Sequence, residues 1–255
     1  MSRIVVKVGS NVLTRADGMP DITMISSLVD QIAELREMGN EVILVSSGAV
    51  ACGKRLIKNA LVENEVDKRQ LYSAMGQVRL IGLYFNLFRD HGIPMGQVLT
   101  MKGNFEEGRE LENQRNCMEV MLRNGVVPVV NENDTVCVTE LMFTDNDELS
   151  GLVARMMKAD MLVLLTNVDG IYDGDPSDGE SEVIPVVHPG DSLEKYISAR
   201  GSSLGRGGMQ SKCTTAMSVA SLGTRVVIAC GRRENVLIDL VLRPDKVIHT
   251  EFATS

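Results

Sequence analysis

Two lysines stand in settings that suit phosphate chemistry. Lys7 lies inside the apolar run IVVKV (4–8), and a lysine in a covered strand is out of place unless its ammonium group meets an anion. Lys212 ends the glycine-rich stretch GSSLGRGGMQSK (201–212). This stretch opens a predicted helix whose free backbone N–H groups would face a phosphate. A loop that leads into a capped helix explains the stretch equally well, so the motif alone does not decide.

A polar stretch directly follows a predicted buried strand. The run VVPVV (126–130) leads into Asn131, Glu132, Asn133 and Asp134. Such residues are common in turns, but a tight turn accounts for one or two of them rather than four. The stretch therefore indicates that a small polar molecule is held there.

Other predicted strands also end in polar or glycine residues. The runs 4–8, 41–45, 161–165 and 225–230 lead into GSN, SSGA, TNVDG and GRR. In an open parallel sheet the carboxyl ends of the strands share one edge, and ligands bind along that edge. These exits predict a common site that includes residues 131–134.

The elements that position this edge alternate along the chain. Short runs rich in Val, Ile and Leu predict strands covered on both faces, at 4–8, 41–46, 93–99, 126–130, 161–166 and 225–230. Helical patterns lie between them, at 22–35 with Gly39 as C-terminal cap, 67–90, 111–123, 146–158 and 208–222. The alternation predicts an α/β fold, a three-layer α/β/α sandwich around a mostly parallel central sheet.

One stretch interrupts the alternation. Residues 135–147, TVCVTELMFTDND, alternate loosely with no helix before them, and we expect a small β-hairpin after the fourth strand. The chain has no repeat, no low-complexity linker and no shift in composition. We therefore expect a single domain over 1–255.

The composition argues against several classes of protein. The 255 residues carry 26 Lys and Arg against 34 Asp and Glu, a formal net charge of −8, with 4% aromatic residues and no Trp. Because neither clustered positive charge nor an aromatic stacking platform is apparent, no nucleic-acid partner is expected.

The sequence also predicts a soluble protein with no membrane partner. No uncharged apolar run approaches the ~20 residues of a spanning helix, and the start MSRIVVKVGS lacks the pattern of a signal peptide. Five widely spaced cysteines without a C-x-x-C pair are typical of reduced thiols. We therefore expect a cytoplasmic location.

Two further motifs are incomplete. GAVACGKR (48–55) nearly satisfies the phosphate-loop pattern, but Arg55 stands where a hydroxyl residue would hold Mg²⁺, so we expect a strand-to-helix turn at Gly48 instead. The aspartates of YDGDPSDGESE (172–182) have the wrong glycine position and no closing Glu for a calcium loop, so we expect a solvated turn.

Five segments, taken in order, resemble the signature segments of the amino acid kinase family. They are Lys7-Val8-Gly9-Ser10, Ser46-Ser47-Gly48-Ala49, Asn131-Glu132-Asn133-Asp134, Thr144-Asp145-Asn146-Asp147 and Gly207-Gly208-Met209-Gln210-Ser211-Lys212. The resemblance runs from Lys7 to about Gly231. NEND and DND, separated by a short hairpin, are similar to the branch that phosphorylates the side-chain carboxylate of glutamate, rather than to acetylglutamate, carbamate or UMP kinases.

Two features depart from the family pattern. Arg206 stands where the family usually has a small hydroxyl residue, before the two glycines of the last segment. Many bacterial members carry a further RNA-binding-like (PUA) domain after the kinase domain, whereas this chain stops at Ser255. We therefore expect the short, single-domain form.

The resemblance implies a reaction and the residues that perform it. The γ-phosphoryl group of ATP would pass to the side-chain carboxylate of L-glutamate, giving L-glutamyl 5-phosphate in the first step of proline biosynthesis. The side-chain carboxyl of glutamate has a pKa of about 4.3 and is ionised at neutral pH. No general base is therefore needed. Lys7 and Lys212 would flank the transferring group as fixed positive charges, and Asp145 would brace both lysines.

The remaining candidate residues divide between the two substrates. The glutamate-binding candidates are Ser47, Asn131, Asp134, Asn146 and Asp147, in a substrate half of about 1–150. The second, nucleotide-binding half is expected at about 151–255. Across the chain, the nucleotide-binding candidates are Lys7, Gly9, Thr166, Asn167, Arg206, Gly207, Gly208, Met209, Gln210, Ser211 and Lys212. The two aspartates of the first set would pair with the glutamate ammonium group. Mg²⁺ would accompany ATP, held largely by phosphate oxygens and water, so no metal ligands are assigned.

The resemblance also implies partners, and two alternatives remain. Proline would act as a feedback inhibitor that overlaps the glutamate site and the segment 50–80, and the chain would form a homodimer or homotetramer. One alternative is a family member that acts on another small carboxylate or phosphate acceptor. The other is a non-catalytic ligand sensor, which would not need both Lys7 and Lys212.

Overall fold

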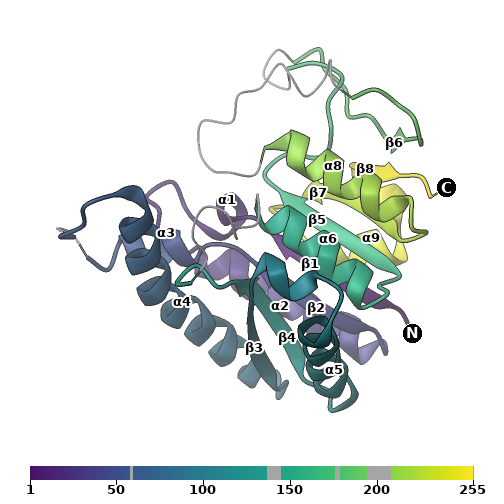
Figure 1. The fold of residues 1–255 in the computed structure, drawn as a ribbon. Coiled ribbons are helices and arrows are strands. Elements are labelled where there is room, and N and C mark those ends of the chain that lie inside the picture. The colour runs from purple at the N-terminus through teal and green to yellow at the C-terminus, as the bar shows by residue number, and fades with distance from the viewer. Residues whose placement is uncertain (58–59, 137–144, 176–178, 194–207, 255) are drawn as a thin grey trace.

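Within the described residues, the fold is organised around one eight-stranded sheet (Figure 1). The structure is a computed structural model that describes residues 1–57, 60–136, 145–175, 179–193 and 208–254. The strand order is β3-β4-β2-β1-β5-β7-β8-β6. The strands are β1 (Arg3–Val8), β2 (Glu41–Ser46), β3 (Met95–Thr100), β4 (Val127–Glu132), β5 (Met161–Thr166), β6 (Val186–Val187), β7 (Arg225–Cys230) and β8 (His249–Phe252).

Helices cover both faces of this sheet (Figure 1). The described helices of one face are α2 (Ile22–Glu37), α4 (Glu65–Asp90) and α9 (Val236–Leu242), and those of the other are α5 (Arg109–Arg123), α6 (Asn146–Met156) and α8 (Met209–Ala220). Shorter elements are α1 (Ser10–Leu13), α3 (Ala49–Lys54), and the 3-10 helices η1 (Lys102–Phe105) and η2 (Pro244–Lys246).

The core lies in two layers because successive strand residues point to opposite faces. In β1, Ile4 and Val6 pack into the layer that contains Leu28 of α2. Val5, between them, packs into the layer that contains Leu149 of α6 and Ala216 of α8. The predicted three-layer α/β/α sandwich is thus confirmed.

The sheet is parallel from β3 through β7, as the continuous apolar runs predicted. The exception is β8, which pairs antiparallel with β7. Its four residues, HTEF, alternate between half-buried and buried positions, so the search for continuous apolar runs missed it. The two-residue strand β6 pairs parallel with β8 at the edge of the sheet, so the last two strands both run against the others, as is common at the edge of a mostly parallel sheet.

The predicted helices and strands are confirmed with small shifts at their ends. For example, α4 begins at Glu65 instead of 67, and β3 begins at Met95 instead of 93. The sequence did not predict α9, whose residues VLIDLVL are mostly buried, since a short apolar run has no helical period. The predicted hairpin at 135–147 falls largely on 137–144, outside the described residues, and stays a prediction.

Within the described part of the chain, no helix combines the length and the apolar character needed to cross a bilayer.

Candidate active site

The carboxyl ends of the central strands meet at one edge of the sheet. β1 lies between β2 and β5, with Val8 opposite Ser46 and Leu165. β4 pairs with β2 in the same direction, and β7 pairs with β5. The residues that follow these strands therefore lie along one edge, where an open parallel sheet binds its ligands.

Two lysines and one aspartate form a buried charge cluster at this edge. Lys7 Nζ lies 2.5 Å from Asp147 Oδ1, and Lys212 Nζ lies 2.9 Å from Asp147 Oδ2. The three residues come from β1, α6 and α8, and their side chains are 5%, 0% and 10% exposed for Lys7, Asp147 and Lys212. The fold therefore brings together two lysines that lie 205 positions apart (212 − 7) in the sequence.

The shifted pKa values show how strongly these charges interact. Burial lowers the pKa of the Lys7 ammonium group below its ordinary value, Asp147 opposes the shift, and the positive charge of Lys212 adds to it. Burial alone would raise the pKa of Asp147, but the two ammonium groups outweigh it and hold that pKa below its ordinary value. Lys7, Lys212 and Asp147 together carry one net positive charge, and fixed ammonium groups of this kind attract an incoming anion.

Asp145 has a different role from the one expected. The sequence placed it between the two lysines, but the structure gives that position to Asp147. The Asp145 carboxylate is the N-cap of α6, and its Oδ1 accepts hydrogen bonds from the backbone N–H groups of Asp147 and Glu148 at 2.8 and 3.0 Å. A cap of this kind satisfies N–H groups that have no partner within the helix. The helix start therefore determines which aspartate reaches the lysines.

The same geometry corrects the expected role of Asp147. We expected it to pair with the ammonium group of glutamate, but its two oxygens face the two lysine ammonium groups instead. Burial, followed by the negative charge of Asp147, raises the pKa of Asp145, while the nearby Ser211 side chain opposes the shift.

The predicted phosphate-facing glycines lie beside the lysines. A Cβ added at Gly9 would lie 3.6 Å from Lys7 Nζ, so the ammonium group sits next to this backbone. Gly208 is the N-cap of α8, and no acidic side chain lies in the first turn of that helix, which begins with Met209, Gln210 and Ser211. Unpaired N–H groups at such a helix start favour an anion.

Two further nucleotide-binding candidates, Thr166 and Asn167, lie within the described residues. Thr166 ends β5 and is buried, and its hydroxyl lies 3.4 Å from the Asn167 side-chain oxygen. Thr166 and Asn167 therefore lie at the carboxyl end of β5, the strand next to β1, at the same edge of the sheet. Arg206, together with the neighbouring Gly207, lies outside the described residues.

Three of the glutamate-binding candidates form one hydrogen-bonded cluster. Asn146 Nδ2 donates to Ser47 Oγ at 2.9 Å and to Asn131 Oδ1 at 2.8 Å. Asn131 Nδ2 in turn donates to the side-chain oxygen of Gln77 at 2.9 Å. These residues come from the carboxyl ends of β2 and β4, from the start of α6 and from the middle of α4, so neutral polar groups from four elements line one position.

The fourth such candidate, Asp134, is held by a residue that sequence reasoning missed. Arg69 of α4 lies within 2.7 Å of both Asp134 and Glu132. Nothing in the sequence distinguished Arg69, because a basic residue on a long helix usually faces solvent. Gln77, two turns further along α4, was missed because a neutral polar residue on a long helix usually faces solvent as well.

The turn after β2 is a packing feature rather than a phosphate loop. Gly48 has φ of 104°, a left-handed conformation that favours glycine, and it starts α3. A Cβ added at Gly53 would lie 1.8 Å from the backbone oxygen of Tyr72. Gly53, the second glycine of the motif GAVACGKR, is therefore needed for the close contact of α3 with α4.

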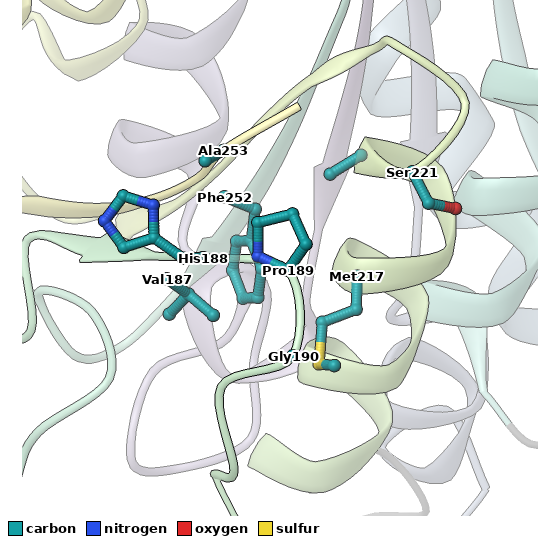
Figure 2. A pocket seen from close by; sticks show the side chains of 9 residues that line it. Val187, His188, Pro189, Gly190, Met217, Ser221, Phe252 and Ala253 are labelled. Atoms are coloured by element: carbon teal, nitrogen blue, oxygen red, sulfur yellow. The ribbon is translucent and has the colours of Figure 1, made fainter. Parts of the chain in front are cut away.

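A separate apolar pocket lies away from this edge (Figure 2). It lies between β6, β8 and α8, and Figure 2 shows Met217 and Phe252 in its lining. Phe252 pairs with Val226 near the amino end of β7, so the pocket opens at the opposite edge of the sheet. It has no place in the candidate active site.

Comparison with known proteins defines the class to which this fold and site belong. The model of the amino acid kinase family matches residues 2–230. The chain therefore belongs to the amino acid kinase family. A solved structure described as an isopentenyl phosphate kinase substrate complex superposes with a TM-score of 0.68 at 16% identity, covering 98% of this chain and 99% of that one. At that identity the likeness shows the fold alone.

Curated relatives point to one branch of the family. A protein named glutamate 5-kinase from Bacteroides thetaiotaomicron is 57% identical over 254 residues, covering 100% of this chain and 71% of its own length. Another glutamate 5-kinase, from Chlorobaculum tepidum, is 46% identical over 236 residues, covering 92% of this chain and 65% of its own length. The chain thus spans about two thirds of the length of these relatives. The resemblance seen in the sequence is confirmed.

Proposed function

We propose that this chain transfers the γ-phosphoryl group of ATP to the side-chain carboxylate of L-glutamate. The product would be L-glutamyl 5-phosphate, and the reaction would be the first step of proline biosynthesis. The observation that carries the proposal is the pairing of Lys7 and Lys212 with one buried aspartate at the ligand edge. The glutamate 5-kinases that match nearly the whole chain support the choice of acceptor.

The chemistry of the transfer is mainly electrostatic. The attacking carboxylate is already ionised at neutral pH, so it needs no base, but it must approach a triphosphate of the same sign. Phosphoryl transfer is accelerated by positioning and by fixed positive charge around the migrating group. The ammonium groups of Lys7 and Lys212, held in place by Asp147, supply that charge from two sides. A sensor that only binds ligands does not need this arrangement.

The acceptor would lie beside the cluster of neutral polar groups. Asn146, Ser47 and Asn131 offer amide and hydroxyl groups that can donate to a carboxylate. Asp134 offers a negative charge for the ammonium group of the amino acid. On this arrangement the side-chain carboxylate of glutamate points toward the lysines.

The nucleotide would lie over the start of α8. We assign the phosphates to Gly9, Gly208 and the first turn of α8, and the base and ribose side to Thr166 and Asn167. In this proposal the two halves, about 1–150 and 151–255, act as one domain because β1 and β5 pair directly across them.

Magnesium fits this site as the companion of ATP. Within the described residues, no group of three or more His, Cys, Asp or Glu side chains is placed to hold a metal ion. Mg²⁺ commonly keeps several waters and binds substrate phosphates with few protein ligands. The buried Oδ2 of Asp145, which has no hydrogen-bond partner among the described residues, can accept a hydrogen bond from a metal-bound water. The ion would neutralise charge on the phosphates.

The direct test measures hydroxamate formation from glutamate, ATP and Mg²⁺ in the presence of hydroxylamine. We expect the unaltered chain to be active and both Lys7→Ala and Lys212→Ala to lose turnover, by roughly a hundredfold or more for each removed charge. Asp134→Ala should chiefly raise the glutamate concentration required. An active enzyme that prefers another acceptor would contradict the proposed substrate, and full activity in either lysine variant would contradict the mechanism.

Three further proposals follow from the family resemblance. Proline would inhibit by overlapping the glutamate site, which a competition experiment against glutamate would test. The chain would form a homodimer or homotetramer, consistent with the exposed apolar side chains Val78 and Phe85 on α4, and light scattering would measure its mass. A cytoplasmic location accords with cysteines that are free among the described residues.

A further inference from the structure

Two buried carboxylates stand side by side at the end of β4. The side chains of Glu132 and Asp134 are 4% and 8% exposed. Removing each carboxylate from water costs free energy, and the two negative charges also repel each other. Such a pair needs a fixed positive partner, and α4 supplies one.

Arg69 reaches both carboxylates with one planar group. Its Nη2 lies 2.7 Å from Glu132 Oε2 and 2.6 Å from Asp134 Oδ1, and its Nε donates to the same Asp134 oxygen at 2.7 Å. A guanidinium presents its donors in a rigid fork, so it fixes the orientation of a carboxylate as well as its charge. Arg69, Glu132 and Asp134 together carry one net negative charge.

The helix that carries Arg69 is itself held firmly against the site. A Cβ added at Gly76 of α4 would lie 1.8 Å from the backbone oxygen of Ala49 in α3. The two helices therefore touch backbone to backbone, and α3 begins directly after Ser47 and Gly48. Arg69 thus lies on one helix of this closely packed pair, and the glutamate-binding candidate Ser47 lies directly before the other.

Other contacts of α4 bind the same loop. Gln70 donates to the backbone oxygen of Thr135 at 2.9 Å, and Gln77 accepts from Asn131 at 2.9 Å. With Arg69, these residues hold the stretch 131–135 from one side. Residues of α4 therefore set the position of the loop that carries Asp134.

We propose that Arg69 is a positioning residue for amino-acid recognition. It holds Asp134 in place to pair with the ammonium group of the amino-acid substrate, and it offsets the negative charge of Glu132. The inference rests on the proposed function, since it concerns the acceptor of that reaction. Arg69 acts through Asp134 and has no part in the phosphoryl transfer itself. It therefore governs which acceptor is chosen more than how fast the phosphoryl group moves.

The test compares glutamate with glutarate, the same diacid without the ammonium group. In Arg69→Met, the glutamate KM should rise roughly tenfold, the effect of losing one charged hydrogen bond, while the KM for ATP and kcat stay within about twofold. The preference for glutamate over glutarate, as a ratio of kcat/KM values, should fall by a similar factor. Arg69→Lys restores the charge but not the fork, so its ratio should lie between those of the wild type and Arg69→Met.

A double variant shows whether the effect passes through Asp134. In an Asp134→Asn background, Arg69→Met should change the glutamate-to-glutarate ratio by less than about twofold, because residues that act as a unit are not additive. An Arg69→Met enzyme with wild-type ratio and KM would overturn the inference, as would equal effects in both backgrounds.

Controls separate this inference from general loss of structure and from failure of the proposed function. Arg225→Met removes an arginine of similar exposure, which pairs with Glu251 at 2.8 Å, and should leave the ratio unchanged. If Arg69→Met does not fold, Arg69→Lys decides, and a wild-type ratio there would count against the inference. A wild type that forms no hydroxamate from glutamate would refute the proposed function and the inference with it. Normal wild-type turnover with no effect at Arg69 refutes the inference alone.

Discussion

Asn146 and Asp147 are neighbours in the first turn of α6, yet they belong to two regions built on different physical principles. Asp147 joins two buried ammonium groups by charge, whereas Asn146 joins Ser47 and Asn131 by neutral hydrogen bonds. Adjacent residues of a helix point about 100° apart, so one turn of α6 can serve both regions. The transfer region, formed by Lys7, Asp147 and Lys212, depends on charge. The part of the acceptor region formed by Ser47, Asn131 and Asn146 depends on the arrangement of neutral groups.

Substitutions in the two regions should therefore change different kinetic constants. Fixed charge around a migrating phosphoryl group matters most in the transition state, so its loss lowers kcat. Neutral hydrogen bonds to the acceptor act on substrate and transition state alike, so their loss raises KM. Substitutions at these two neighbouring positions can therefore test the division directly.

The largest effect is expected for Asp147→Asn. The amide cannot neutralise Lys7 and Lys212, and breaking a buried ion pair of this kind costs about 3–5 kcal/mol of stability. We expect kcat to fall by roughly a thousandfold, measured by hydroxamate formation, with a lower midpoint of thermal unfolding.

The adjacent residue provides the control for that substitution. Glu148 pairs with Lys102 at 2.7 Å and is 26% exposed, so Glu148→Gln should change kcat by less than about threefold, as expected for a partly exposed ion pair. If Asp147→Asn retained kcat to within tenfold, charge bracing would not be the basis of the transfer region.

An intermediate effect is expected at the contact of α3 with α4. Gly76→Ala would place a methyl group against the Ala49 backbone oxygen, and overpacking of this kind costs about 1–3 kcal/mol. Because α3 and α4 also carry acceptor-side residues, the glutamate KM should rise together with the loss of stability. Chemical denaturation and steady-state kinetics measure the two effects.

Gly82→Ala in the same helix is the matched control. No atom lies within 4 Å of a Cβ built at Gly82, so this change should raise the free energy of unfolding by up to about 1 kcal/mol through helix propensity. Equal effects of the two substitutions would show that the close approach of α3 and α4 does not hold the acceptor region.

The smallest effect is expected for Asn146→Ala. Losing its hydrogen bonds to Ser47 and Asn131 should raise the glutamate KM about tenfold, near 1.4 kcal/mol, with little change in kcat. Steady-state kinetics at saturating ATP measure both constants. A large fall in kcat at unchanged KM would erase the distinction between Asn146 and Asp147 on which the comparison depends.

Much of the fold could be predicted because the strands of a buried parallel sheet are continuous apolar runs. The runs 4–8, 41–46 and 161–166 became the three central strands, and their polar exits fell on one edge. The antiparallel strand β8 and the short helix α9 could not be predicted, because a strand of four residues and a seven-residue apolar run are too short to show a distinctive period.

The candidate site was predicted in its residues more than in its contacts. Lys7 could be singled out because a charge in an apolar run needs a partner, and the structure supplies Asp147. The choice between Asp145 and Asp147 was wrong because it depends on where α6 begins, and helix boundaries are poorly determined by sequence. Arg69 was missed because its partners lie more than 60 positions away, at Glu132 and Asp134.

The most direct test of the central claim is a crystal structure with ADP, aluminium fluoride, Mg²⁺ and glutamate. The aluminium fluoride stands in for the phosphoryl group in transit. We expect Lys7 Nζ and Lys212 Nζ both to lie within hydrogen-bonding distance of it, at about 2.7–3.2 Å, with Asp147 still between them. A structure in which either ammonium group points away from the aluminium fluoride would contradict the account.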